Sequence, residues 1–254
     1  MSYFGSREWL IEVQKGNVPG HSLVHKFGRN DAIPNASWAF VNLLGFTAWP
    51  LAAATAVRVK VGNAADASGG AGATEVTVQG LDETGAEVSE AMTTAGGTAS
   101  TATTATFMRV HRAWVSAVGT YGAANTGDVV IENGGGGTDL IQIAAGEGQT
   151  QFAGYTIPLA KTGYLLSALI TVDAGANKSA NARMFQRRDI FDVTADMPSK
   201  RIKLHFDGIV GQIGFDPKSP NGSIPALTDI WWEGYGDGAA SQMSVDFELL
   251  LVDD

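Results

Sequence analysis

Between residues 56 and 252 the chain consists of short segments in which apolar and polar residues alternate, separated by glycine-rich turns. Arg109–Val115 and Val245–Leu251 are typical of these segments. Successive side chains of a strand point to opposite faces, so the pattern buries one face of a sheet and exposes the other to water. Turns recur at intervals of about 8 to 12 residues, as in sandwiches and jelly rolls. The sequence therefore predicts an all-β protein.

The distribution of these segments divides the chain into three parts. Residues 56–147 and 148–254 each contain enough strands for one antiparallel β-sandwich or jelly-roll-like domain. Residues 1–55 contain short apolar runs around a loop rich in helix and strand breakers, and they fit two interpretations. They form either an extended N-terminal arm, lying on the domain or on a neighbouring subunit, or the first two strands of the sandwich. Residues 93–105, rich in Thr, Ala and Gly, predict an exposed, mobile loop.

Composition and charge narrow the classes of function. The 254 residues carry a formal net charge of −9, whereas a nucleic-acid-binding protein usually presents a basic face. The chain has no cysteine, which excludes disulfides, thiolate metal sites and thiol nucleophiles. No apolar run approaches the roughly 18 to 20 residues of a membrane span. We therefore expect a soluble protein that binds neither nucleic acid nor membrane.

Candidate catalytic and metal-binding motifs have simpler explanations. The glycine-rich segments 69–74 and 134–138 are each followed by a strand, whereas a phosphate loop leads into a helix, and no Lys-Ser/Thr pair completes the pattern, so both predict turns. His21 and His25 have the spacing of metal ligands on a helix, but glycines at positions 20 and 28 bracket them and favour a loop. No serine lies in a Gly-x-Ser-x-Gly elbow. We expect a protein that is not an enzyme and holds no cofactor or metal ion.

The remaining histidines and the basic residues indicate surfaces. His111 and His205 lie in strand patterns and are interpreted as solvent-facing or interface residues. Arg183, Phe185 and Arg187 share one strand face, in the only basic concentration of the chain. This face either docks onto an acidic neighbouring surface or is simply solvated.

Trp231 and Trp232 are neighbours in a predicted strand and must therefore point to opposite faces. One of them is expected in the core. The other fits either an interface or a platform on which a sugar ring stacks.

Four segments of the chain resemble virion structural proteins of tailed bacteriophages. They are residues 20–30, 77–90 with their Gly-Leu-Asp turn, 107–113 and 148–164. The resemblance implies a particle component, made in the host cytoplasm and located in the virion, and it transfers no catalytic residue. It is compatible with a capsid decoration or cement protein, or with a component of the tail or fibre attachment.

Within this resemblance, a cement protein is the first hypothesis. It would bind the lattice of the major capsid protein, or other virion proteins, through the arm and the sandwich surfaces, as a homo-oligomer for which a trimer is expected. The alternatives are a tail or fibre-attachment protein, and a carbohydrate-binding module that binds a surface glycan through Trp231 or Trp232. The residues predicted at the interface are Trp9, His21, His25, Lys26, Phe27, Arg29, Arg183, Phe185, Arg187, Arg188 and Trp232.

Overall fold

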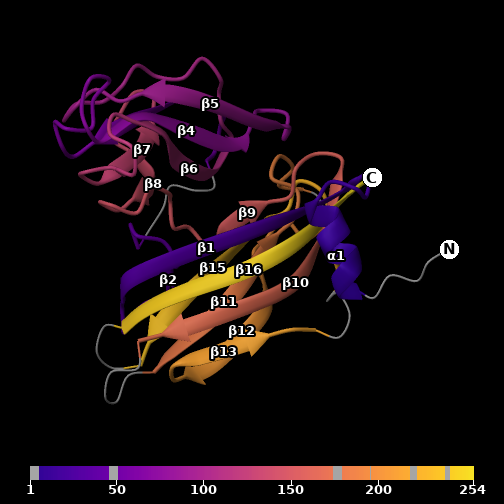
Figure 1. Ribbon diagram of the computed structural model, residues 1–254. Coiled ribbons are helices and arrows are strands. Elements are labelled where there is room, and N and C mark those ends of the chain that lie inside the picture. Colours follow the sequence, from indigo (N-terminus) through magenta and orange to yellow (C-terminus); the bar gives the residue numbers. More distant parts are fainter. Residues whose placement is uncertain (1–5, 46–50, 174–178, 195, 218–221, 238–240) are drawn as a thin grey trace.

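The protein is described from a computed structural model that covers residues 6–45, 51–173, 179–194, 196–217, 222–237 and 241–254. Within these ranges the chain forms one helix, α1 (Ser6–Gln14), and otherwise strands, turns and loops, which confirms the all-β prediction. The strands build two sandwiches of unequal size, a larger one and a smaller one (Figure 1).

The larger sandwich takes strands from both ends of the chain. They are β1 (His21–Ile33), β2 (Ala39–Phe40), β9 (Gly154–Thr156), β10 (Lys161–Val172), β11 (Ala180–Arg187), β12 (Arg201–Ile209), β13 (Gln212–Phe215), β14 (Ser223–Ile224), β15 (Asp229–Gly236) and β16 (Ser241–Asp253). Its first sheet has the order β1-β16-β10-β13, with β14 beside β10. Its second sheet has the order β12-β11-β15-β2, with β9 beside β15.

The two sheets of the larger sandwich bury one apolar core. Val245, Phe247 and Leu249 alternate along β16 and pack against residues such as Met184 and Trp232 of the second sheet. The intervening residues of β16 are less buried, as the period of two predicts. The core therefore follows directly from the alternation in the sequence.

The smaller sandwich lies between β2 and β9 in the sequence. Its strands are β3 (Val57–Val61), β4 (Ala73–Leu81), β5 (Glu87–Thr93), β6 (Arg109–Val118), β7 (Val129–Asn133) and β8 (Asp139–Ile143). They form the sheets β3-β7-β8 and β5-β4-β6. The predicted turns connect hairpins, because β4 pairs with β5 and β7 pairs with β8. All strands of this sandwich lie within residues 56–147.

The first part of the chain joins the larger sandwich. The helix α1 ends before Gly16, which has a positive φ of 74°. The strand β1 then pairs antiparallel with β16, from His21 opposite Val252 to Ile33 opposite Ser241, and the two ribbons run side by side in Figure 1. Residues 21–33 are thus a strand of the sandwich, in agreement with the second interpretation, and not a free arm.

The segment 93–105 differs from the exposed, mobile loop that its composition predicts. It follows the outer edge of β3, where the backbone N–H groups of Ser100 and Thr103 donate to the carbonyls of Val59 and Val57. In return, the N–H groups of these two valines donate to the hydroxyl groups of Ser100 and Thr103. An edge strand exposes unpaired backbone groups, and these small polar side chains can satisfy them at short range.

Candidate interaction surface

A buried ion pair connects the two sandwiches. Arg109 of β6 donates from Nε and Nη2 to the two carboxylate oxygens of Asp229 on β15, at 2.9 and 3.1 Å. Both side chains are at most 1% exposed. Asp229 also accepts from Thr156 at 2.7 Å and from Arg187 at 2.5 Å. A bidentate pair with its lone pairs satisfied in this way fixes how β6 lies on the second sheet.

Next to this pair, the edge of β1 contacts β6. Lys26 is buried, and its Nζ donates to the backbone carbonyl of His111 at 2.5 Å. Arg112 donates to the backbone carbonyl of His25 at 2.6 Å. The His111 ring accepts at Nε2 from the backbone N–H of Thr156, at 3.3 Å. We call this junction of β1, β6 and β9 the seam.

Burial determines the protonation of the titratable side chains at the seam. Burial, followed by the charge of Arg112, holds the pKa of Lys26 well below its usual range. Burial and the charges of Lys26, Arg109 and Arg112 lower the pKa of His111 well below its usual value. Because Nε2 of neutral His111 accepts a hydrogen bond, its proton is assigned to Nδ1. Burial also raises the pKa of Tyr155, which stays protonated.

The basic strand face is neutralised within the chain. Arg183 pairs with Glu233 at 2.7 Å and lies 3.8 Å from the centroid of the Trp38 ring. Arg187 pairs with Asp229, as described above. Between them, Phe185 is buried and stacks on Trp231. Each of the two arginines thus has a carboxylate partner on β15, and an acidic neighbour is not needed to explain them.

Neither tryptophan of the pair is available to a sugar. Trp232 is fully buried in the core of the larger sandwich, and Trp231 is buried on the opposite face of β15 against the smaller one. The prediction that they point to opposite faces is confirmed. The assignment of Trp232 to an interface, and of either residue to a glycan platform, is wrong because both faces of β15 are covered.

The other predicted interface residues are dispersed. Trp9 of α1 meets His21 edge-on, with ring centroids 5.4 Å apart. Phe27 is half-buried on β1. Arg29 pairs with Asp31 and Glu147. The residue Arg188 is half-buried at the end of β11, and its Nε is buried with no partner among the described residues. The structure therefore does not bring the predicted residues into one surface.

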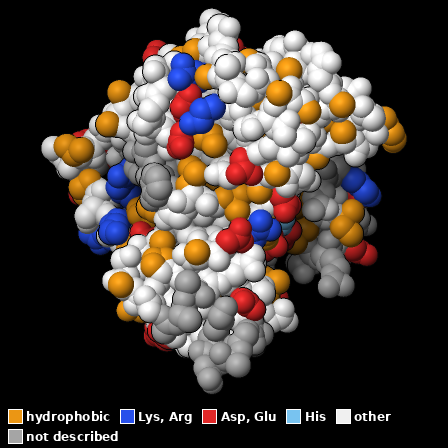
Figure 2. Space-filling model, turned by 90° about the vertical axis from the view of Figure 1, so that its left-hand side faces the viewer, with side chains coloured by type: hydrophobic (Ala, Val, Ile, Leu, Met, Phe, Trp, Pro, Cys, Tyr) orange, Lys and Arg blue, Asp and Glu red, His pale blue; other side chains and the backbone are white. Residues whose placement is uncertain are grey.

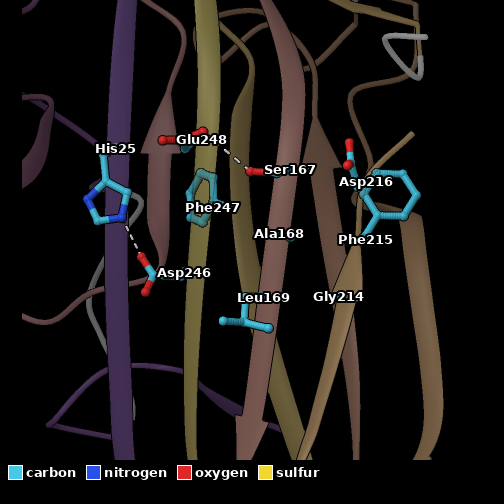
Figure 3. A pocket seen from close by; sticks show the side chains of 10 residues that line it. All are labelled: His25, Ser167, Ala168, Leu169, Gly214, Phe215, Asp216, Asp246, Phe247 and Glu248. Atoms are coloured by element: carbon cyan, nitrogen blue, oxygen red, sulfur yellow. Dashed lines mark hydrogen bonds and ion pairs between the residues drawn. The ribbon is translucent and has the colours of Figure 1, made fainter. Parts of the chain in front are cut away.

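His25 belongs to a hollow on the outer face of the first sheet of the larger sandwich. The hollow has a volume of about 320 Å³, and Figure 3 shows its lining from β1, β16, β10 and β13. His25 bonds to Asp246, and Ser167 donates to Glu248 at 3.5 Å. Gly214, which has no side chain, leaves its floor open. The carboxylates give this hollow an acidic character.

The most exposed apolar segment is the loop between β11 and β12. Phe191, Val193 and Met197 are 41, 86 and 41% exposed. Asp189 and Met197 have positive φ values of 54° and 67°, which non-glycine residues rarely adopt. On the face in Figure 2, hydrophobic side chains are scattered among acidic, basic and other groups. We call residues 189–197, apart from position 195, the apolar loop.

Sequence reasoning missed the seam. His111 was predicted to face solvent or an interface but is buried, because β6 carries the smaller sandwich onto β1 and β9. Arg109 and Asp229 are 120 positions apart, so no spacing rule connects them. The only available signal was a strand that places two arginines and a histidine within four residues.

Two further features concern cofactors and membranes. Among the described residues, no group of three or more His, Cys, Asp or Glu side chains could hold a metal ion. In the same part of the chain, no helix is both long and apolar enough to cross a membrane.

Comparison with known proteins gives limited results. No protein-family model matches the chain, and no curated protein matches it. It is similar to a structure of the Gt strain of infectious bursal disease virus, with 10% identity and a TM-score of 0.24, over 95% of this chain and 77% of that one. A VP2 subviral particle of the same virus gives 10% identity and a TM-score of 0.24, over 93% and 73%. Likeness at this level carries no argument about function.

Proposed function

We propose that this chain is a non-enzymatic structural component of a virus particle, of the tailed-bacteriophage kind that four of its segments resemble. One observation supports this above all. The four segments are separate in the sequence, but they meet at and beside the seam. Residues 20–30 contribute Lys26, residues 107–113 contribute His111, and residues 148–164 contribute Thr156.

The fourth segment, residues 77–90, completes the group. Gln79 lies opposite Arg112 in the β4–β6 pairing, and the carbonyl of Gly85 accepts from the N–H of Leu159 at 2.8 Å. The resemblance therefore concerns a contiguous structural unit, namely the joint between two sandwiches. Scattered similarity in unrelated loops would carry less weight.

Within this class, we favour a capsid decoration or cement protein that binds the major capsid protein lattice as a trimer. A cement protein must hold its two sandwiches in a fixed arrangement. It must also present an exposed surface to neighbouring proteins. The buried Arg109–Asp229 pair supports the first requirement. The apolar loop supports the second, since exposed large apolar side chains close together are typical of protein contacts.

Immunogold imaging of intact particles from the source culture tests the virion assignment. Regular labelling over the head is the expected result for a cement protein. Label confined to the tail or to one vertex would instead favour the tail or fibre-attachment alternative. Particles without label would contradict the virion proposal altogether.

Variants of the apolar loop test the capsid contact. Val193→Asp places a charge at the most exposed apolar residue of the loop and should reduce incorporation into particles at least tenfold, while the thermal unfolding temperature stays unchanged. Tyr121→Asp is the matched control, because Tyr121 is fully exposed on a loop of the smaller sandwich. Equal incorporation of both variants would remove the loop from the interface. Deletion of residues 1–30 is not a suitable test, because it removes most of β1.

A further inference from the structure

A second hollow lies at the seam and differs in charge from the acidic one. It has a volume of about 360 Å³ and is lined by residues of β1, β4, β6, β9 and the segment that leads to β9. The polar side chains of its lining are His25, Lys26, Gln79, His111, Arg112, Gln149 and Tyr155. No carboxylate is among the described residues that line it. In a chain of net charge −9, a hollow with basic and no acidic lining is unusual.

Its cationic groups have few partners. Lys26 uses one of its N–H donors on the His111 carbonyl. A guanidinium has five donors, and Arg112 uses one of them on the His25 carbonyl. No other hydrogen-bond acceptor contacts either group within the described ranges. Several donors thus remain for an incoming anion.

We propose that this hollow binds a carboxylate group, held by Lys26 and Arg112. The charge count favours a carboxylate over a phosphate dianion. Arg112 brings one permanent positive charge, and Lys26 can gain a second when an anion arrives. The permanent charge of Arg112 alone matches the single charge of a carboxylate, whereas a phosphate dianion would also need the second charge. The Tyr155 hydroxyl, kept protonated by burial, can supply a further donor.

Binding should be coupled to proton uptake. In the empty hollow, burial and Arg112 favour the neutral amine of Lys26, which lines the same hollow as His111 and Tyr155. A bound carboxylate favours the ammonium, so the pKa of Lys26 rises and a proton is taken from the buffer. Affinity should therefore fall as the pH rises. The inference rests on the seam alone and does not depend on the virion assignment.

Calorimetric titration of the full chain with butyrate, a monocarboxylate, tests the site, and inorganic phosphate is the alternative ligand. We expect one saturable butyrate site, a smaller or absent phosphate signal, and heats at pH 8 that change with the ionisation enthalpy of the buffer. Lys26→Met should weaken binding at least about tenfold, the loss of one charge-assisted hydrogen bond. Lys15→Met is the matched control, because Lys15 is an exposed lysine on the segment after α1.

Arg112→Gln provides a second variant in case Lys26→Met does not fold, and it should also weaken binding. Three results would overturn the inference. The first is a butyrate dissociation constant weaker than about 50 mM. The second is an affinity that Lys26→Met and Arg112→Gln leave unchanged. The third is saturable binding of phosphate in place of butyrate.

Discussion

The two sandwiches differ in whether the edge strands of their sheets are covered. In the smaller one, the outer edge of β3 is covered by the segment around Ser100 and Thr103, and β6 is covered by residues 148–150. In the larger one, β12 and β13 end their sheets, and they expose Ile202 and Ile213. In the smaller sandwich, nearby segments of the chain thus cover the edge strands β3 and β6. In the larger sandwich, β12 and β13 remain edges at which a neighbouring chain can pair. Contacts with neighbours are therefore expected on the larger sandwich.

Breaking the connection between the sandwiches should have the largest effect. Asp229→Ala leaves Arg109 buried without its carboxylate and should lower the free energy of unfolding by about 4 kcal/mol. Chemical denaturation of the variant measures this loss. Lys161→Ala, which removes an exposed ion pair with Asp253, should cost less than about 1 kcal/mol. Similar losses in both variants would contradict the role of the buried pair.

Adding a methyl group at a crowded glycine should destabilise the fold, whereas adding one at an open glycine should not. The Cβ of Gly28→Ala would lie 2.1 Å from the backbone N of Ala153, so the variant should lose about 3 kcal/mol. Gly214→Ala on β13 meets nothing within 4 Å and should change stability by no more than about 0.5 kcal/mol. Thermal unfolding of the two variants checks the contrast. An unaffected Gly28→Ala would mean that β1 does not lie against Ala153 and Val41.

The hydroxyl groups that cover β3 should each contribute a moderate amount. Thr103→Ala removes the acceptor for the Val57 N–H and should cost about 1.5 kcal/mol. Hydrogen exchange at the Val57 amide should accelerate accordingly. Thr101→Ala, at an exposed position of the same segment, is the control and should leave that amide protected. Equal protection in both variants would mean that the segment does not cover the edge.

The smallest effect is a pH dependence that arises from His111. Its folded-state pKa is lowered, so the unfolded chain binds a proton first as the pH falls below about 6.5. Stability should therefore fall by about 1 kcal/mol from pH 6.5 to 5.5, and His111→Gln should remove this part of the slope. Denaturation curves at the two pH values measure it. His205→Gln, at an exposed position on β12, is the control variant.

The alternation of residues was sufficient to predict most strands but not the way the sandwiches join. Strands such as Val245–Leu251 are specified locally, because burial on one face of a sheet dictates a period of two. The joint between the sandwiches depends on residues such as Arg109 and Asp229, which are far apart in the sequence. They come together only once all the strands are in place. The composition of residues 93–105 predicts an exposed, mobile loop, yet the hydroxyl groups of Ser100 and Thr103 accept hydrogen bonds from an edge strand that the sequence does not identify as one.

The pairing of β1 with β16 has a consequence for synthesis. His21 lies opposite Val252, so β1, the first strand of the larger sandwich, can pair only after β16, its last strand, has been synthesised. The smaller sandwich is contiguous in the sequence and can fold on the ribosome while this strand is still unpaired. Because the pairing spans more than 200 residues, closure of the larger sandwich should be the slow step of folding. A nascent chain that lacks β16 would present β1 as an open edge to every other nascent chain nearby.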